Sequence, residues 1–440
     1  MFLTLLIVSL VILLLLDYFV LFKRDLATPA ISFSLGFLVC AIILLNFIVI
    51  WGVRIHIETL GLILGGNVLL SFGAFLYRRK RRNSIKTNET ECSFYLISVR
   101  RLQILFVFQL FLHGLRTYFL FKFYGFSSLS ENLVAHTEEL KFGTEAMTYP
   151  FGVGFLIGIV SNLGYVFAFL IPVYIAKAKN NTSQFLWLVV NYILALFGSL
   201  LSSGRSPMLW MLVALGTFYI ISLYQYKKKV GVKRILIWVC AAYAFLSGFQ
   251  QLGYLLGRKE SDETVGYVVG VYCGAEIQNL DDYLNGPKYT TDYWGESTFY
   301  GFWELLENDW GMVKLRSERS DFLPFNNRGY YPLGNVYTTF QSYHIDFGMT
   351  GALIVCFLIG FIMQYIYTRV KNGNDFKTGV ISTTTYIYSI IVPSMFMSFF
   401  SEAFFGVFIN LLNIRFWLGY VVVFFIFYGR MPWSKSVRKS

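Results

Sequence analysis

The sequence predicts an all-α polytopic membrane protein. Of its 440 residues, 56% are hydrophobic and only 14% are charged, which is more apolar side chain than a soluble protein of this length can bury. Several runs exceed the roughly 18 apolar residues that indicate a transmembrane helix. Lysines and arginines gather in the segments between these runs. Because lipid leaves no partner for free backbone groups, the spanning segments are expected to be helices.

We expect about eleven spans. The first apolar run, Leu3 to Leu16, lacks a basic n-region and a small-residue cleavage site, so it is expected to be retained rather than removed as a signal peptide. The expected spans are residues 3–22, 29–50, 57–77, 101–121, 151–175, 184–201, 207–226, 235–254, 346–368, 379–400 and 404–428. Residues 1–254 then hold spans 1–8, residues 255–345 form one large loop, and residues 346–440 hold spans 9–11 and a basic tail.

The distribution of positive charge predicts the orientation. Alternate loops carry most of the 37 lysines and arginines, including the clusters Arg78–Arg82 and Lys227–Lys229. The positive-inside rule makes these loops cytoplasmic, with the N-terminus outside and the C-terminus inside. The net charge of +12 therefore indicates orientation and contact with anionic membrane lipids, and it does not indicate nucleic-acid binding.

The loop at 255–345 is expected to be external. A loop of this length is uncommon unless it is functional or disordered, and its many aromatic residues argue against disorder. We expect a small folded cap with short helices near 265–284 and 299–306. The rings suit stacking on sugars, but they equally suit the core of the cap or an interfacial belt. The aromatic residues are Tyr283, Tyr289, Tyr293, Trp294, Phe299, Tyr300, Phe302, Trp303 and Trp310.

A hairpin between two spans, Ser202–Pro207, combines an arginine with a helix start. Ser206 and Pro207 are favoured at the beginning of a helix, so Arg205 is expected beside free helix N–H groups. A guanidinium with such groups can bind a phosphate-type anion, which at a membrane surface is a lipid-linked phosphate or diphosphate. The alternative is an arginine that only anchors the membrane interface.

Charged residues inside spans are costly and mark functional positions. In the fourth span, His113 and Arg116 lie toward the outer face, and Arg116 can help Arg205 to clamp a diphosphate. A buried structural pair is the alternative. In the last span, Arg415 is expected near mid-depth, and Glu402 at its outer rim.

The stretch before the ninth span carries hydrogen-bonding side chains at the external mouth. Asn335, Tyr337 and Thr338 can bind sugar hydroxyls, and Asp346 and His344 are the candidate general bases. A satisfied interfacial histidine and a helix-capping aspartate are the alternatives. Two glycines three residues apart, Gly348 and Gly351, are expected to allow close helix contact.

These features together resemble the oligosaccharide repeat-unit polymerases, the Wzy-type enzymes of capsule and O-antigen assembly. The resemblance rests on many spans with one large external loop in the second half, on the Ser-Gly-Arg205-Ser-Pro hairpin, and on the segment from Gly-Asn335-Val-Tyr337-Thr338 to Asp346-Phe-Gly348-Met-Thr-Gly351. It is best over residues 195–370. The family is related to the O-antigen ligases, whose external motif begins with a histidine at a place nearer Asn335 than His344.

The resemblance implies a GT-C-like glycosyltransferase in the bacterial plasma (inner) membrane. Such an enzyme moves a growing glycan from undecaprenyl diphosphate to the sugar of a new lipid-linked repeat unit at the outer face. It implies a diphosphate held by Arg205, Arg116 and Ser206, no metal or cofactor, and partners that include a flippase and a chain-length regulator. The competing functions are a ligase-like transferase, a lipid-oligosaccharide flippase, and a non-enzymatic scaffold. The two halves of the sequence show no repeat of the kind that would indicate a transporter.

Overall fold

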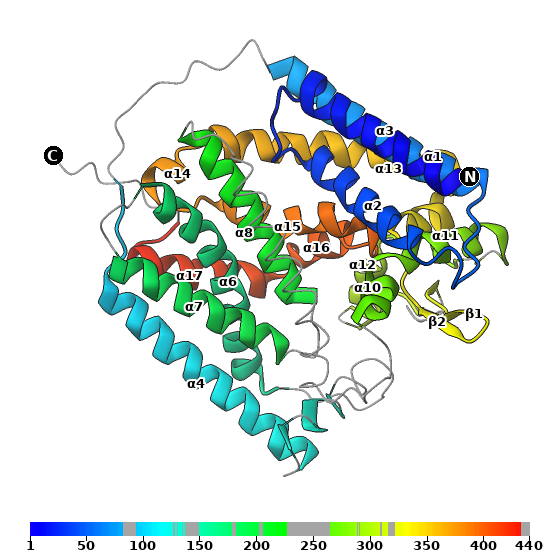
Figure 1. Cartoon of the computed structure of the whole chain (residues 1–440). Coiled ribbons are helices and arrows are strands. Elements are labelled where there is room, and N and C mark those ends of the chain that lie inside the picture. The colour runs from blue at the N-terminus through cyan, green and yellow to red at the C-terminus, as the bar shows by residue number, and fades with distance from the viewer. Residues whose placement is uncertain are drawn as a thin grey trace. The chain divides into compact units, whose positions relative to one another are not determined.

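The structure is a computed structural model (Figure 1). It describes residues 1–81, 94–125, 128–129, 131–133, 135–136, 149–177, 182–201, 206–226, 265–315 and 322–432, except residues 288, 290 and 309. The chain forms two compact units, each built from three stretches of sequence. Unit 1 comprises Met1–Asn88, Glu263–Arg369 and Ile391–Asn410, and unit 2 comprises Glu89–Asp262, Val370–Ile390 and Leu411–Ser440.

Unit 1 contains the N-terminal helices and the polar segment that precedes α13. α1 packs against α2 and α3, and α11 packs against the same two helices. Its helices are α1 (Phe2–Leu16), which continues in a π-helical turn (Asp17–Leu21), α2 (Pro29–Leu45), α3 (Ile57–Arg81), α10 (Val265–Cys273), α11 (Ala275–Asn285), α12 (Tyr300–Asn308), α13 (Thr339–Asn372), a 3-10 turn (Met397–Phe399) and α16 (Phe404–Asn410).

Unit 2 is a bundle in which α6 packs against α7, α8 and α17, and α4 packs against α7. Apolar residues surround these helices on most sides, as expected of membrane helices. The helices are α4 (Val99–Tyr124), α6 (Phe151–Lys177), α7 (Thr182–Leu200), α8 (Ser206–Gln225), α14 (Asp375–Thr378), α15 (Thr383–Phe396) and α17 (Ile414–Tyr428). α13 ends in this unit, and α15 begins in it and ends in unit 1.

The chain is mostly helical, as the sequence predicts. Among the described residues, 7 helices are long and apolar enough to cross a membrane, and two shorter apolar helices, Pro29–Leu45 and Ile414–Tyr428, fall below that length. The total of eleven spans stays a prediction, since the span expected at 235–254 lies outside the described residues.

The expected span at 404–428 is divided. α16 ends at Asn410 and α17 begins at Ile414, where the side chain of Asn413 accepts a hydrogen bond from the backbone N–H of Arg415. Arg415 therefore lies exposed in the first turn of a helix and not in the middle of one. Glu402 caps α16, because its Oε1 accepts the backbone N–H of Phe405 at 2.8 Å.

Glycines bring α3 and α13 together, but not the pair that the sequence suggested. Gly348 lies at a kink in α13, with φ of 64°, and an added Cβ there would meet open space. Gly351 faces the side chain of Phe347 in its own helix. The close approaches occur instead at Gly73, which lies against the carbonyl of Phe357, and at Gly360 of α13, which lies against the carbonyl of Leu70. Small residues that let backbones touch are typical of membrane helix pairs.

The segment between α10 and α13 is folded. The helical stretches expected at 265–284 and 299–306 correspond to α10 with α11 and to α12, and a break at Gly274 separates the first two. A short antiparallel hairpin follows, with β1 (Asn326–Arg328) paired to β2 (Tyr331–Gly334). Of the aromatic rings, Tyr293 stacks on Trp303 at 4.7 Å, whereas Trp294 and Trp310 are largely exposed.

Gly73→Ala is expected to lower the free energy of unfolding by about 1–3 kcal/mol, because the added Cβ collides with a backbone carbonyl that cannot move aside alone. The matched control is Gly61→Ala on the same helix, where the Cβ meets open space; it should be neutral or stabilising by up to about 1 kcal/mol. Thermal unfolding in detergent measures both. Equal melting temperatures for the two variants would contradict this account of the α3–α13 contact.

Candidate functional site

Arg116 is buried in unit 2 and joins α4 to the end of α7. Its Nη1 donates to the carbonyl of Gly198 at 3.1 Å, and its Nε donates to the hydroxyl of Tyr149 at 3.2 Å. The guanidinium also lies over the Tyr149 ring, 6.0 Å from its centroid. The last carbonyls of a helix have no partner within it and carry partial negative charge, so a cation is stabilised there.

No carboxylate of the described residues forms an ion pair with Arg116. The ion pairs in the described part of the chain are those of Asp281 and Asp282, which both belong to unit 1. Among the described residues, the guanidinium contacts two neutral oxygen atoms and a ring. A buried charge that is satisfied by neutral groups alone keeps a strong attraction for an opposite charge. The arrangement therefore suits an anion-binding residue.

His113 lies one turn before Arg116 and has a structural role. Its Nε2 lies 3.1 Å from the carbonyl of Leu194, and its imidazole fills the space that a side chain at position 198 would need. Both residues thus fasten α4 to the last turns of α7. The contacts of His113 thus agree with the alternative of a structural residue. Arg116 makes a structural contact too, but it also brings a buried charge.

The hairpin with Arg205 follows directly on the end of α7 that Arg116 contacts. Arg205 itself lies outside the described residues. Ser206 is the first residue of α8 and is exposed, with Pro207 next, so this helix begins where the sequence predicted. α7 and α8 pack against each other. Whether Ser206 binds an anion stays a prediction.

A short segment after α4 adds a histidine that the sequence did not single out. His136 is buried, and its Nδ1 lies 3.1 Å from the hydroxyl of Tyr124. Burial and the positive charge of Arg116 lower the pKa of His136. Leu120, Leu133 and Leu201 pack together, and Tyr124 packs against this cluster. The imidazole is therefore held neutral beside the buried arginine.

In unit 1, the segment before α13 uses several of its polar side chains internally. The hydroxyl of Tyr337 donates to the carbonyl of Pro324 at 2.9 Å. The hydroxyl of Thr338 accepts the backbone N–H of Phe340 at 3.3 Å, and both side chains are buried. Asn335 is partly buried. Of the three residues expected to bind sugar hydroxyls, Asn335 is thus the most accessible.

The two candidate bases lie on α13, on either side of Ile345, and have different partners. The Nδ1 of His344 lies 3.0 Å from the hydroxyl of Tyr283, whose ring stacks on Tyr289 at 5.7 Å. Burial raises the pKa of Tyr283, so this hydroxyl stays protonated and can donate. Asp346 accepts the backbone N–H groups of Ser297 and Thr298 at 3.2 and 2.6 Å. Asp346 thus fastens a turn of the polar segment to α13.

A row of polar residues on α11 connects this unit. Asn279 donates to the carbonyls of Leu333 and Val336, and Asp282 accepts from Asn326 and Arg328 of the hairpin. Asp281 accepts from the start of α3. This row was not predicted from the sequence, where its sign is a set of amides and acids in a helix that also carries buried apolar residues.

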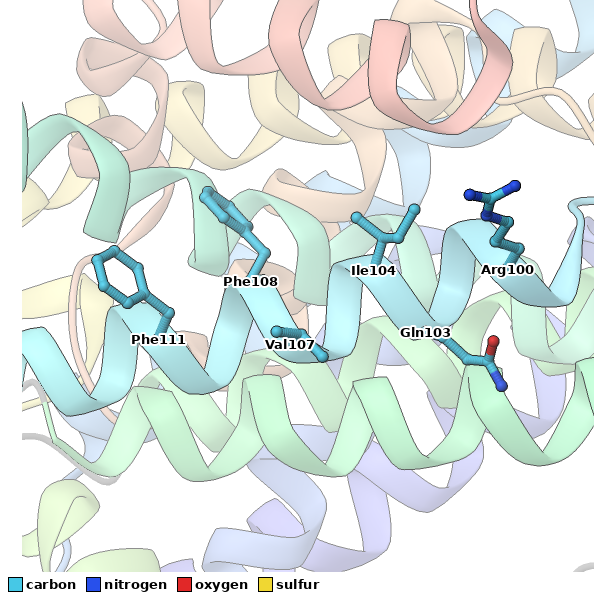
Figure 2. Close-up of a pocket in the computed structure, with 6 residues that line it drawn as sticks. All are labelled: Arg100, Gln103, Ile104, Val107, Phe108 and Phe111. Atoms are coloured by element: carbon cyan, nitrogen blue, oxygen red, sulfur yellow. The ribbon is translucent and has the colours of Figure 1, made fainter.

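A pocket on α4 includes none of these groups in its lining. It has a volume of about 540 Å³ and is lined by six side chains of α4 alone (Figure 2). Four of the six are apolar, and all except Phe108 are exposed, as expected of a helix face turned toward lipid. The lining residues are Arg100, Gln103, Ile104, Val107, Phe108 and Phe111.

Comparison with known proteins adds no assignment: no protein-family model, no curated protein and no solved structure matches the chain. The resemblance to repeat-unit polymerases therefore stays a prediction that rests on residues of this sequence.

Arg116→Ala is expected to lose about 1–3 kcal/mol of stability, because the carbonyl of Gly198 loses its donor. The variant should also lose the rise in melting temperature that a soluble polyprenyl diphosphate gives the unmodified protein. The matched control is Arg100→Ala, an exposed arginine on the same helix. If polyprenyl diphosphate stabilises Arg116→Ala as much as the unmodified protein, Arg116 is a structural residue only.

Asp346→Asn is expected to destabilise unit 1 by about 1–3 kcal/mol. An asparagine has one acceptor oxygen, so one of the two N–H groups now bound by Asp346 would face an amide donor. Thermal unfolding measures the effect, with Glu304→Gln, an exposed acid on α12, as the control. An unchanged melting temperature would show that the contact contributes nothing to stability and would leave Asp346 available as a base.

Proposed function

We propose that this protein is a membrane glycosyltransferase that polymerises lipid-linked oligosaccharide repeat units. It transfers a growing glycan from undecaprenyl diphosphate to the sugar of a new lipid-linked unit on the outer face of the bacterial plasma membrane. The observation that carries the proposal is the buried Arg116, whose hydrogen bonds within the described part of the chain go to neutral oxygen atoms, one of them at the end of α7. The hairpin that bears Arg205 follows that helix end directly.

The proposed reaction requires the protein to stabilise negative charge on the diphosphate and to position the two sugars. The acceptor hydroxyl oxygen bonds to the anomeric carbon of the donor, the bond from that carbon to the diphosphate oxygen breaks, and the proton of the hydroxyl passes to a base. Negative charge develops on the diphosphate, so arginine side chains and a helix start stabilise the transition state. Orientation of the two sugars provides the remaining acceleration.

The acceptor side of the proposal rests on residues 335–346. Asn335 is partly buried and is the candidate to bind sugar hydroxyls. Asp346 and His344 are the candidate bases of this segment. Their contacts with the turn at 297–298 and with Tyr283 hold both side chains in fixed positions, which a base requires.

A ligase-like transferase and a flippase are the competing functions, and the surface glycan of a deletion strain separates them. Loss of a polymerase leaves single repeat units at the surface and no ladder of longer chains on a gel. Loss of a ligase leaves polymer on the lipid carrier, and loss of a flippase leaves repeat units on the cytoplasmic face. Either of the last two results would overturn the proposal.

Arg205→Ala is expected to slow polymerisation about 30- to 1,000-fold, which corresponds to about 2–4 kcal/mol of lost transition-state stabilisation. Arg205→Lys should rescue poorly, because an ammonium lacks the planar fork that binds two phosphate oxygens. The measurement is glycan chain length in the deletion strain that carries each variant, at equal protein levels in the membrane. Near-normal chain length with Arg205→Ala would reduce Arg205 to an interface anchor.

A further inference from the structure

His56 and Asp281 form a pair that resembles the base of a hydrolase or transferase. His56 immediately precedes α3, and its Nδ1 lies 2.7 Å from Oδ2 of Asp281 on α11. The carboxylate is almost fully buried, with 1% of its side chain exposed, whereas 51% of the imidazole is exposed. A buried carboxylate thus holds an imidazole at the surface of unit 1.

The contacts assign the tautomer of this imidazole. Asp281 accepts two further hydrogen bonds, from the backbone N–H of His56 at 2.7 Å and from the hydroxyl of Thr59 at 2.5 Å. A carboxylate can only accept hydrogen bonds, so Nδ1 must be protonated and donates a hydrogen bond to Asp281. The amide nitrogen of Asn285 also lies 3.1 Å from Nδ1, and one of its two N–H groups donates to the backbone carbonyl of Asp281 at 2.8 Å. The 2.7 Å contact with the Asp281 carboxylate is the shorter of the two at Nδ1, so the Nδ1–H points to the carboxylate.

In this tautomer Nε2 holds a free lone pair. Among the described residues Nε2 has no hydrogen-bond partner, and the imidazole is half exposed. A carboxylate that fixes Nδ1–H leaves Nε2 as the proton acceptor and stabilises the imidazolium that forms. This is the arrangement of a general base, and it differs from the contacts of His344 and Asp346.

A purely structural role for the pair does not need the imidazole. Asp281 caps the start of α3 through a backbone N–H, which every residue except proline provides, and through the hydroxyl of Thr59. Capping therefore explains Asp281 and Thr59 but not the imidazole. The other ionisable side chains in the adjoining stretches of chain are Arg54 and Glu58, each two residues from His56, and Glu276 and Asp282 on α11.

We propose that His56, oriented by Asp281, accepts the proton of a sugar hydroxyl of a lipid-linked glycan; this inference rests on the proposed function. As the hydroxyl oxygen bonds to the anomeric carbon, its proton moves to Nε2 and the electron pair of the broken bond leaves with the diphosphate. The expected topology agrees, because the connection at 51–56 joins two spans on the outer face.

The test uses full-length protein in liposomes, with the lipid-linked repeat unit isolated from the deletion strain as substrate. His56→Asn keeps an amide donor for Asp281 but accepts no proton, so polymerisation should fall by about 10²- to 10⁴-fold. His56→Gly should regain activity when imidazole is added. Thr59→Val, which removes a hydrogen bond to Asp281, should lower the melting temperature and cost less than about tenfold in rate. Glu58→Gln, an exposed neighbour, should match the unmodified protein.

The outcomes separate the inference from the function on which it rests. Polymer from the unmodified protein together with activity of His56→Asn within about threefold of it would overturn the role of His56 and leave the polymerase intact. A His56→Asn variant that loses activity only in proportion to its melting temperature, with no rescue of His56→Gly by imidazole, would also overturn it. No polymer from the unmodified protein would overturn the proposed function itself.

Discussion

The polar face of α11 is the constraint on which the described part of unit 1 depends. Buried polar groups must find hydrogen-bond partners, and the side chains of this helix find them in three other elements. Asp281 binds the start of α3, Asp282 binds the β1–β2 hairpin, and Tyr283 binds His344 at the start of α13. One helical turn thus fixes the position of a hairpin and two membrane helices, which is the rigid support that a reaction site requires.

Hydropathy predicted the helices of this chain but not their interruptions. A run of apolar residues indicates burial in lipid or protein, but it does not indicate the backbone conformation of any one residue. The break between α16 and α17 and the kink at Gly348 were therefore not predicted. The same limit explains the wrong glycine pair. Gly73 meets the carbonyl of Phe357, nearly three hundred residues away in the chain, and no local spacing encodes such a contact.

A residue of the candidate site could be predicted from the sequence where that residue is unusual in its own segment. A charge within an apolar run is costly wherever it lies, so Arg116 was evident from the sequence alone. The pair of His56 and Asp281 was not, because neither residue is unusual in its own segment and they lie 225 residues apart. The function of each side chain depends on the other, so only the fold shows the pair.

Three buried ionisable groups show why Arg116 points to a ligand. Glu276 is fully buried and accepts from the thiol of Cys40, and burial raises the pKa of Glu276 well above its usual value, so the carboxyl is neutral. Asp281 is satisfied differently, because its carboxylate accepts three hydrogen bonds. An arginine cannot release its proton in a protein, so Arg116 cannot become neutral as Glu276 does. Among the described residues it has no carboxylate partner either, and this is why Arg116 supports the proposal of an anionic substrate.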